Sequence, residues 1–459
     1  MRDILVVGIC VIGALMALRR PWIGVLLWTW ISVMNPHRYC WGFAYDAPVA
    51  AMAAGSTLFG LLLTRERRNP FSLGAPAAWL LLFMLWMTLS WLLGYGFNSA
   101  DILASMRDYD LWNRVIKTLF MTFVALALLH NRLHILAFAW VFAMSLGILG
   151  IKGGLFTVAS GGSYRVWGPA GSFIYDNNEF ALALITIIPL LHFLQLQSAR
   201  KWVRHGLTLA MLLCAAAALG SRSRGALVAL AAMGGLLWWR SRRKGMMAVA
   251  ILAVLAMVLL MMPEEWWERM RSIFDPAADN SALGRLRAWK VAIQVALHHA
   301  TGAGMVYLHP VIFYMWDSSQ GDPIAAHSVY FQILGNHGFI GLFLYLMMGV
   351  LTFRYAGWLR RHARAIPEAQ WAADLGAMAQ VSMAGFAVGG AFLSLAYVDI
   401  PFDIMVLVLV TRRWVQTRGW EHDPRMGFLE YCGLRRSRAR PRARPSGSGQ
   451  GGKRAGAGA

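Results

Sequence analysis

The chain has 459 residues, of which 58% are hydrophobic and 14% charged, and its formal net charge is +21. Soluble domains carry about 25% charged residues, so this composition excludes a soluble globular protein. Because a segment in lipid must satisfy its own backbone hydrogen bonds, we predict an all-α, polytopic membrane protein. The basic residues lie mostly in short loops and in the C-terminal tail, which is the positive-inside pattern. We therefore expect contacts with anionic membrane lipids and no nucleic acid.

Apolar runs along the chain predict about 12 or 13 transmembrane helices. Several runs are shorter than the roughly 20 residues that an untilted crossing needs, so we expect some tilted or re-entrant segments. The first run ends before Arg19-Arg20-Pro21 without a small-residue cleavage site, which favours a retained helix over a signal peptide. The predicted runs are 4–18, 22–35, 48–64, 77–95, 116–129, 133–158, 179–197, 206–220, 226–239, 246–262, 327–352, 373–395 and 401–414.

Basic residues in short loops predict which side of the membrane each loop faces. The segments TRERR, SARKWVRH, RSRRK and RYAGWLRRHAR alternate along the chain with loops on the other side, so we assign them, with the basic tail, to the cytoplasm. The chain then divides into N-terminal transmembrane helices at 1–262, one large outward-facing helical loop at 263–326, C-terminal transmembrane helices at 327–414 and a basic tail at 415–459. We expect this tail to be disordered.

The large outward-facing loop carries two predicted helices. Trp266, Trp267, Met270 and Ile273 recur at helical spacing in PEEWWERMRSIFD, which predicts an amphipathic helix lying on the membrane surface. A second helix is expected in NSALGRLRAWKVAIQVALHH, and an aromatic turn follows it.

Arginines on the predicted outer face depart from the usual charge distribution and need a reason. Arg222 and Arg224 lie in the short connection SRSRGA. A guanidinium presents a planar fork of donors to an anionic oxygen, so phosphate binding is one interpretation. The alternative is that this connection faces the cytoplasm, or that the two side chains extend to the membrane surface.

A second pair of arginines, Arg285 and Arg287, lies in GRLRAW. Residues two apart on a helix point in different directions, so at most one of the two faces a given site. Arg285 shares a helix face with Trp289, four residues later. A solvated amphipathic helix is the alternative interpretation.

The third cluster is GGSYRVWGPAGSFIYDNNEFAL, at 161–182. Arg165 lies in its glycine-rich part, and glycines let a backbone approach a ligand closely. Asp176 and Asn177 directly precede an apolar run, where either residue is a candidate cap for the helix that follows.

His327 stands at the entrance of a long apolar run. Histidine titrates near neutral pH and can accept a proton from an attacking hydroxyl, so His327 is the candidate general base. The alternative is a structural histidine whose hydrogen bonds are satisfied at the membrane boundary. This alternative is less favoured because several arginines are predicted on the same face. His337 lies deeper in the same run and is interpreted as a structural or orienting residue.

Motifs for metals and cofactors are not found. His298, His299, His309 and His327 do not share a metal-ligand spacing. The sequence contains neither a P-loop nor a dinucleotide fingerprint. We therefore predict no metal and no cofactor.

Three motifs in order resemble the O-antigen ligase/polymerase superfamily. They are SRGALVAL at 223–230, GRLRAW followed by GAGMVYLHP within 284–310, and AHSVYFQILGNHGFIGLFLYL at 326–346. DNNEFALAL at 176–184 and the opening MRDILVVGI look most like the O-glycosylation ligases associated with the exosortase A system. The resemblance covers the chain to about residue 413.

The resemblance implies a metal-independent glycosyltransferase of the bacterial inner membrane, with its active site facing the periplasm. It would move a glycan from a polyprenyl-diphosphate carrier to a hydroxyl of a protein or saccharide acceptor. By the same resemblance Arg224 and Arg285 would hold the diphosphate, with Arg165 as a looser counterpart, and His327 would be the base. Arg222 and Arg287 have no clear counterpart in the family.

The run GNHGF departs from the GEHGF that the family often carries, so Asn336, with His337, is expected to give a weaker supporting contribution than a carboxylate would. Two other functions stay open: a polymerase of repeat units from the same superfamily, and a transporter of lipid-linked glycans without transfer activity. A transporter would favour charges in the middle of the membrane and two related halves, and the sequence has no internal repeat.

Overall fold

The computed structural model describes residues 1–65, 68–70, 74–94, 109–240, 244–271, 280–317 and 322–424. Across these ranges the regular secondary structure is helical, without strands. The α-helices are α1 (Arg2–Arg19), α2 (Pro21–Met34), α3 (Val49–Leu63), α4 (Ala75–Leu93), α6 (Tyr109–Leu128), α7 (Arg132–Ala159), α8 (Asn177–Gln197), α9 (Lys201–Gly220), α10 (Arg224–Arg240), α11 (Lys244–Met261), α12 (Glu264–Arg271), α13 (Asn280–His298), α14 (Pro310–Trp316), α15 (Val329–His362), α16 (Gln370–Gly390) and α17 (Asp399–Gln416). Short 3-10 helices are η1 (Pro36–Tyr39), η3 (Ala363–Ala365), η4 (Pro367–Ala369) and η5 (Gly419–Glu421).

Each predicted apolar run coincides with one of these helices, and six helices are long and apolar enough to cross a membrane. The six are α4, α6, α7, α8, α9 and α15. The expected all-α, polytopic membrane fold is therefore confirmed. The aromatic turn expected after α13 contains a short helix, α14, whose first turn is capped by the His309 side chain.

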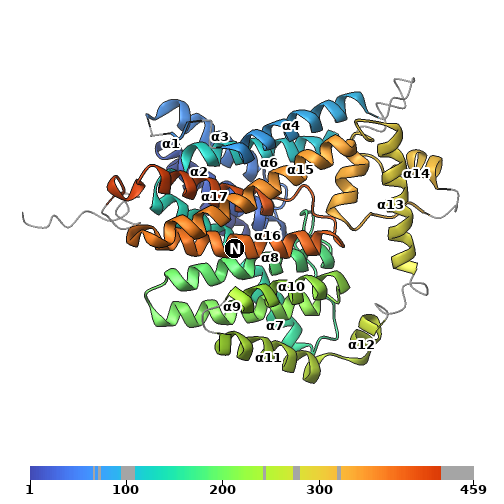
Figure 1. The fold of residues 1–459 in the computed structure, drawn as a ribbon. Coiled ribbons are helices and arrows are strands. Elements are labelled where there is room, and N and C mark those ends of the chain that lie inside the picture. Colours follow the sequence, from blue (N-terminus) through green and yellow to red (C-terminus); the bar gives the residue numbers. More distant parts are fainter. Residues whose placement is uncertain are drawn as a thin grey trace, which may run out of the picture.

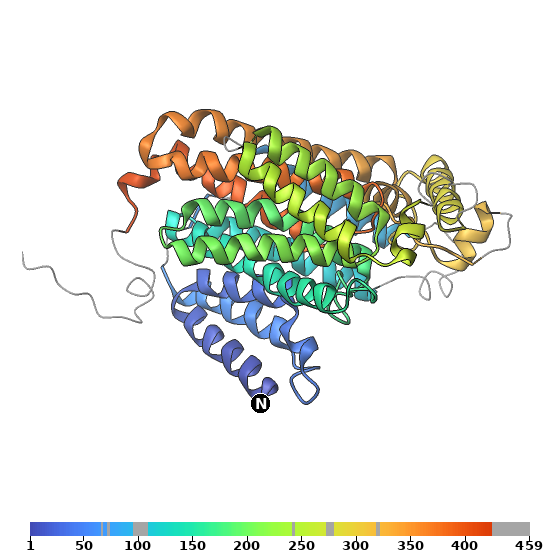
Figure 2. The ribbon, with the colours of Figure 1, turned by 90° about the horizontal axis from the view of Figure 1, so that it is seen from below.

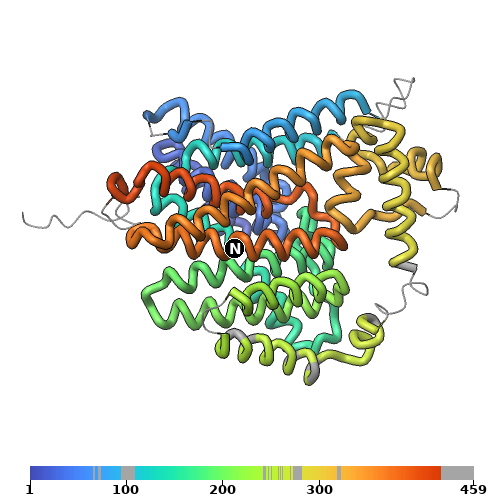
Figure 3. Tube along the Cα trace, viewed as in Figure 1, coloured from blue at the N-terminus to red at the C-terminus, as the bar shows by residue number. Residues whose placement is uncertain are grey.

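The long helices run side by side as a bundle, and α13 crosses one end of it with α14 on its far side (Figures 1 and 2). α8 is buried along most of its length between α9 and α16. The chain returns through the bundle from α15 to α16 and then to α17, and each of these helices packs against the next (Figure 3). α1, α2 and α3 form a group at the side of the bundle, which is joined to the rest mainly through α2 and α7 (Figure 2).

Three of the segments that the sequence assigns to the outer face lie together at the end of the bundle crossed by α13, which we call the α13 end. The backbone N–H of Val166 donates to the carbonyl of Gly220 over 3.2 Å. The indole Nε1 of Trp266 donates to the carbonyl of Leu219 over 3.1 Å, so α12 is bound to the end of α9. The turn between α9 and α10, the loop before α8 and the large loop therefore lie together, as their predicted common side requires.

The sequence predicts one unbroken helix after His327, but α15 is broken at Gly338, whose φ of 67° and ψ of −173° are not helical. The break leaves carbonyl groups without helical partners. Backbone N–H groups of Ala303 and Gly304 donate to the carbonyls of Gly335 and Asn336, both over 2.9 Å. The large loop thus completes the hydrogen bonding of a helix within the bundle.

Candidate functional site

His327 lies directly before α15 in a position that α13 fixes. The indole Nε1 of Trp289, on α13, donates to the carbonyl of Ala326 over 2.7 Å. The Trp289 ring also stacks on Phe331, with centroids 4.6 Å apart and planes 11° from parallel. His327 itself has a φ of 43°, in the left-handed region that few non-glycine residues occupy. Contacts on both sides of His327 therefore hold its backbone in position.

Arg285 lies one helical turn before Trp289 on α13, and its charge acts on His327. Burial lowers the pKa of His327, the Arg285 guanidinium lowers it further, and Asp176 opposes this effect. The pKa of His327 thus lies below the ordinary histidine value of about 6.5. At neutral pH it is uncharged and able to accept a proton.

Arg287 has a different environment, as the spacing of two residues predicts. Its Nε and Nη2 donate to Oδ2 of Asp317 over 3.0 and 2.5 Å. This pair joins α13 to the end of α14, so Arg287 supports the large loop.

Asp176 caps α8 and also interacts with His327. Its Oδ1 accepts hydrogen bonds from the backbone N–H and the side-chain Nδ2 of Asn178, both over 2.8 Å. Burial alone raises the pKa of Asp176, but hydrogen bonds from Glu179 and Asn178 and the charge of His327 bring it below its ordinary value. Asp176 is therefore a fixed negative charge near the imidazole. Sequence reasoning identified the cap but missed the interaction, because no spacing links the two residues.

The turn between α9 and α10 lies against the start of α8. Asn177 donates from Nδ2 to the carbonyl of Ser221 over 2.6 Å. Arg222 has a φ of 57° and donates from Nη2 to the carbonyls of Gly162 and Ser163, over 3.0 and 2.8 Å. Arg222 thus ties this turn to the loop that follows α7.

Arg224 is the first residue of α10 and is partly buried. The next residue, Gly225, packs against the segment after α16 so closely that an added Cβ would lie 2.9 Å from Cβ of Phe392. This contact fixes the start of α10, and with it Arg224, at the α13 end.

The end of α16 connects the starts of α8, α10 and α15. A Cβ added at Gly389 would lie 2.4 Å from Cδ1 of Leu182, and one at Gly390 would lie 3.1 Å from Cγ2 of Val329. Tyr330 donates from its hydroxyl to the carbonyl of Ala387 over 2.7 Å. The helix starts that carry Asp176, Arg224 and His327 are therefore packed around one helix end.

Arg165 lies in the loop between α7 and α8, next to the buried Val166, and its side chain is exposed. It belongs to the α13 end, but its side chain is not part of the buried packing around His327. Its predicted role in binding a diphosphate stays a prediction.

Asn336 and His337 lie elsewhere, at the break in α15. His337 is fully buried and hydrogen-bonds to Oγ of Ser90 over 3.0 Å and to the hydroxyl of Tyr397 over 2.8 Å. Asn336 donates to the same hydroxyl over 2.9 Å, and its Oδ1 accepts from the backbone N–H of Tyr307 over 3.4 Å. At about 1.5 Å per residue, His337 lies about 12 Å along α15 from its first residue, Val329. The contacts of both residues hold the break in place.

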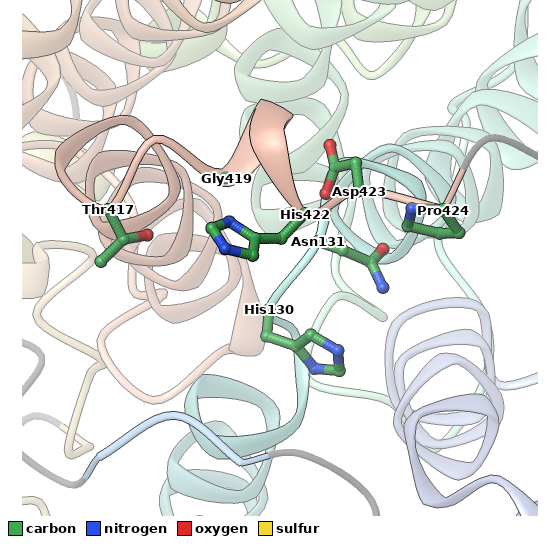
Figure 4. Close-up of a pocket in the computed structure, with 7 residues that line it drawn as sticks. All are labelled: His130, Asn131, Thr417, Gly419, His422, Asp423 and Pro424. Atoms are coloured by element: carbon green, nitrogen blue, oxygen red, sulfur yellow. The ribbon is translucent and has the colours of Figure 1, made fainter.

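An open cavity of about 320 Å³ lies at the opposite end of the bundle, where α6, α7 and α17 meet (Figure 4). It is lined by His130, Asn131, Thr417, Gly419, His422, Asp423 and Pro424. This cavity is separate from the arginines and His327. In the described ranges, no three His, Cys, Asp or Glu side chains are arranged to hold a metal ion.

Two family models match the sequence. Residues 1–199 match a Family of unknown function (DUF5935), and residues 209–346 match the family O-Antigen ligase. A search of curated proteins found no match. The second range contains Arg224, Arg285 and His327, whereas Asp176 lies in the first. The match at 209–346 thus supports the O-antigen ligase superfamily for this chain, and with it a multi-pass bacterial membrane enzyme of the ligase or polymerase type.

Proposed function

We propose that this protein transfers a glycan from a polyprenyl-diphosphate carrier to a hydroxyl group on a protein or saccharide. One observation carries the proposal: a histidine with a lowered pKa interacts with a half-buried arginine and with a fixed carboxylate, at the end of the bundle where a second arginine begins α10. The O-Antigen ligase match over the same residues supports this reaction class.

His327 is the proposed general base. Its neutral imidazole takes the proton of the acceptor hydroxyl while the hydroxyl oxygen forms a bond to the anomeric carbon of the glycan. The bond between that carbon and the phosphate oxygen breaks, and the polyprenyl diphosphate leaves with the electron pair. The proton on the imidazolium then passes to solvent, which restores the base.

Arg224 and Arg285 are the proposed diphosphate-binding residues. Negative charge builds up on the leaving diphosphate, and fixed guanidinium groups stabilise it in a site where water is scarce. Arg165, exposed on the neighbouring loop, is proposed as a further contact to the diphosphate. Arg222 donates hydrogen bonds to two backbone carbonyls, so its proposed role is to stabilise the turn that precedes Arg224.

The finer assignment rests on sequence motifs and charge. We place the protein in the bacterial inner membrane with the α13 end facing the periplasm, because the charge pattern of the sequence assigns the basic loops to the cytoplasm. The transmembrane regions 1–262 and 327–414, the periplasmic loop 263–326 and the cytoplasmic tail 415–459 follow from this orientation. DNNEFALAL favours the O-glycosylation ligases of the exosortase A system over the polymerases, and the reaction is proposed to need no metal.

The direct test is glycan transfer by the purified protein in lipid nanodiscs, with a polyprenyl-diphosphate-linked glycan, a protein acceptor and EDTA. We expect His327→Ala and Arg285→Ala to lose about 100-fold or more of the transfer rate. Lys290→Ala is the matched control, because it removes an exposed cation from the same helix. Wild-type rates in both site variants would overturn the proposal. Products that extend only the lipid-linked glycan would identify a polymerase.

A further inference from the structure

Asp176 is held more firmly than a helix cap alone requires. Two groups of Asn178 donate to the same carboxylate oxygen, each over 2.8 Å, and the side chain of Glu179 also hydrogen-bonds to Asp176. Asn177 binds the turn before α10 through the carbonyl of Ser221, over 2.6 Å. The carboxylate therefore has a fixed direction, and the backbone on which it stands is anchored to a second helix start.

The packing of α16 brings together the two helix starts that carry this carboxylate and His327. Leu182 on α8 and Val329 on α15 both pack against the glycines at the end of α16. Each residue lies within two helical turns of the site residue on its own helix, Asp176 or His327. The electrostatic interaction between Asp176 and His327 acts in both directions, raising the pKa of the histidine and lowering that of the carboxyl group.

Two charged groups act on His327 in opposite directions. Arg285 on α13 disfavours the protonated imidazole, and Asp176 before α8 favours it. Glu179 on α8 is bound to Asp176, and Arg224 begins α10. The segment 387–396 between these helix starts carries no titratable side chain.

This balance has a chemical consequence. A guanidinium that binds the diphosphate weakens a neighbouring base, because the base gains a positive charge in the transition state. A carboxylate that interacts with the base compensates for that loss. Capping does not need the charge, since asparagine caps a helix about as well as aspartate.

We propose that Asp176 is a positioning residue that stabilises the imidazolium form of His327 against the charge of Arg285 during transfer. The inference rests on the proposed function, in which His327 accepts the proton. It adds a carboxylate, from the part of the chain before residue 200, to a base and two arginines, His327, Arg224 and Arg285, that all lie after residue 209.

Asp176→Asn tests this proposal because it keeps the cap and removes only the charge. The transfer rate of wild type falls as the pH drops through the pKa of His327. In Asp176→Asn we expect this acidic limb to move to lower pH. The protonated imidazole no longer has a carboxylate that stabilises it, so the pKa of His327 falls. We also expect the rate on the plateau to fall on the order of tenfold. A merely structural cap would move neither.

The matched control is Glu265→Gln, which removes an exposed negative charge from α12 at the same end of the bundle and should leave the pH profile unchanged. A readout besides activity is NMR of isotope-labelled histidine, with the His327 signal assigned by its loss in His327→Gln. Its titration should move to lower pH in Asp176→Asn.

An unshifted His327 titration in Asp176→Asn, with His327→Ala inactive, would overturn the inference and leave the proposed function standing. An active His327→Ala variant would overturn the proposed function itself.

Discussion

Trp289 donates a hydrogen bond from its indole to the carbonyl of Ala326, over 2.7 Å. The helix that carries Arg285 is thereby bound to the residue directly before His327. The proposed base and a proposed diphosphate-binding residue thus hold their relative positions through one side chain, which itself takes no part in the reaction.

Replacing Trp289 by Phe should separate this bond from the stacking on Phe331, because a phenyl ring still stacks but donates no hydrogen bond. We expect kcat/KM for transfer to fall about tenfold, since a small displacement of a catalytic group is costly. We expect the free energy of unfolding to drop by about 1 kcal/mol. The control is Trp267→Phe, on α12. Transfer kinetics equal to wild type in Trp289→Phe would show that the bond does not position His327.

The pH dependence of transfer should report the lowered pKa of His327. Only the neutral imidazole accepts a proton, so kcat/KM should rise with pH through a pKa below about 6.5 and stay constant above it. Arg285→Gln removes a positive charge that lowers this pKa, so the acidic limb of its residual activity should move to higher pH. Lys290→Gln should leave the limb in place. A shift to lower pH in Arg285→Gln would contradict the assigned electrostatics.

The contact between the large loop and the break in α15 should not tolerate a side chain at Gly302. This residue has a φ of 65°, and an added Cβ would lie 2.6 Å from backbone atoms of Asn336 and Gly338. Gly302→Ala should lower the free energy of unfolding by more than about 1 kcal/mol, which thermal unfolding in detergent measures. Gly349→Ala is the control, because Gly349 lies within α15 with open space at its Cβ and should be neutral or stabilising. Equal melting temperatures for the two variants would be inconsistent with this packing.

The proposed orientation can be tested with cysteines at exposed positions of the two ends. Tyr164, near the α13 end, is 66% exposed and Trp202, at the other end, is 69% exposed. In a Cys432→Ser background, Tyr164→Cys should react with a membrane-impermeant maleimide added to spheroplasts, and Trp202→Cys should react only after lysis. The reverse pattern would place the site on the cytoplasmic side.

The helices could be predicted from the sequence because long apolar runs leave few other structures in lipid. The shared face of Arg285 and Trp289, and the different surroundings of Arg287, followed from helical spacing alone. The break at Gly338 was not predicted, because the apolar pattern continues through it. Its backbone groups are satisfied by a loop that precedes it in the chain.

Contacts between distant segments could not be predicted from the sequence. The interaction of Asp176 with His327 depends on how α8, α15 and α16 pack, which no local pattern encodes. Asn336 and His337 illustrate the opposite case. They are close to His327 in sequence and share a motif with it, yet their side chains bind Ser90 and Tyr397 deeper in the bundle.

The most direct measurement is an experimental structure of the protein in lipid with bound polyprenyl diphosphate. We predict the diphosphate at the α13 end, with guanidinium groups of Arg224 and Arg285 on its oxygens and the His327 imidazole facing the space left for the glycan and acceptor. A diphosphate bound in the cavity lined by His130 and His422, at the opposite end of the bundle, would contradict it.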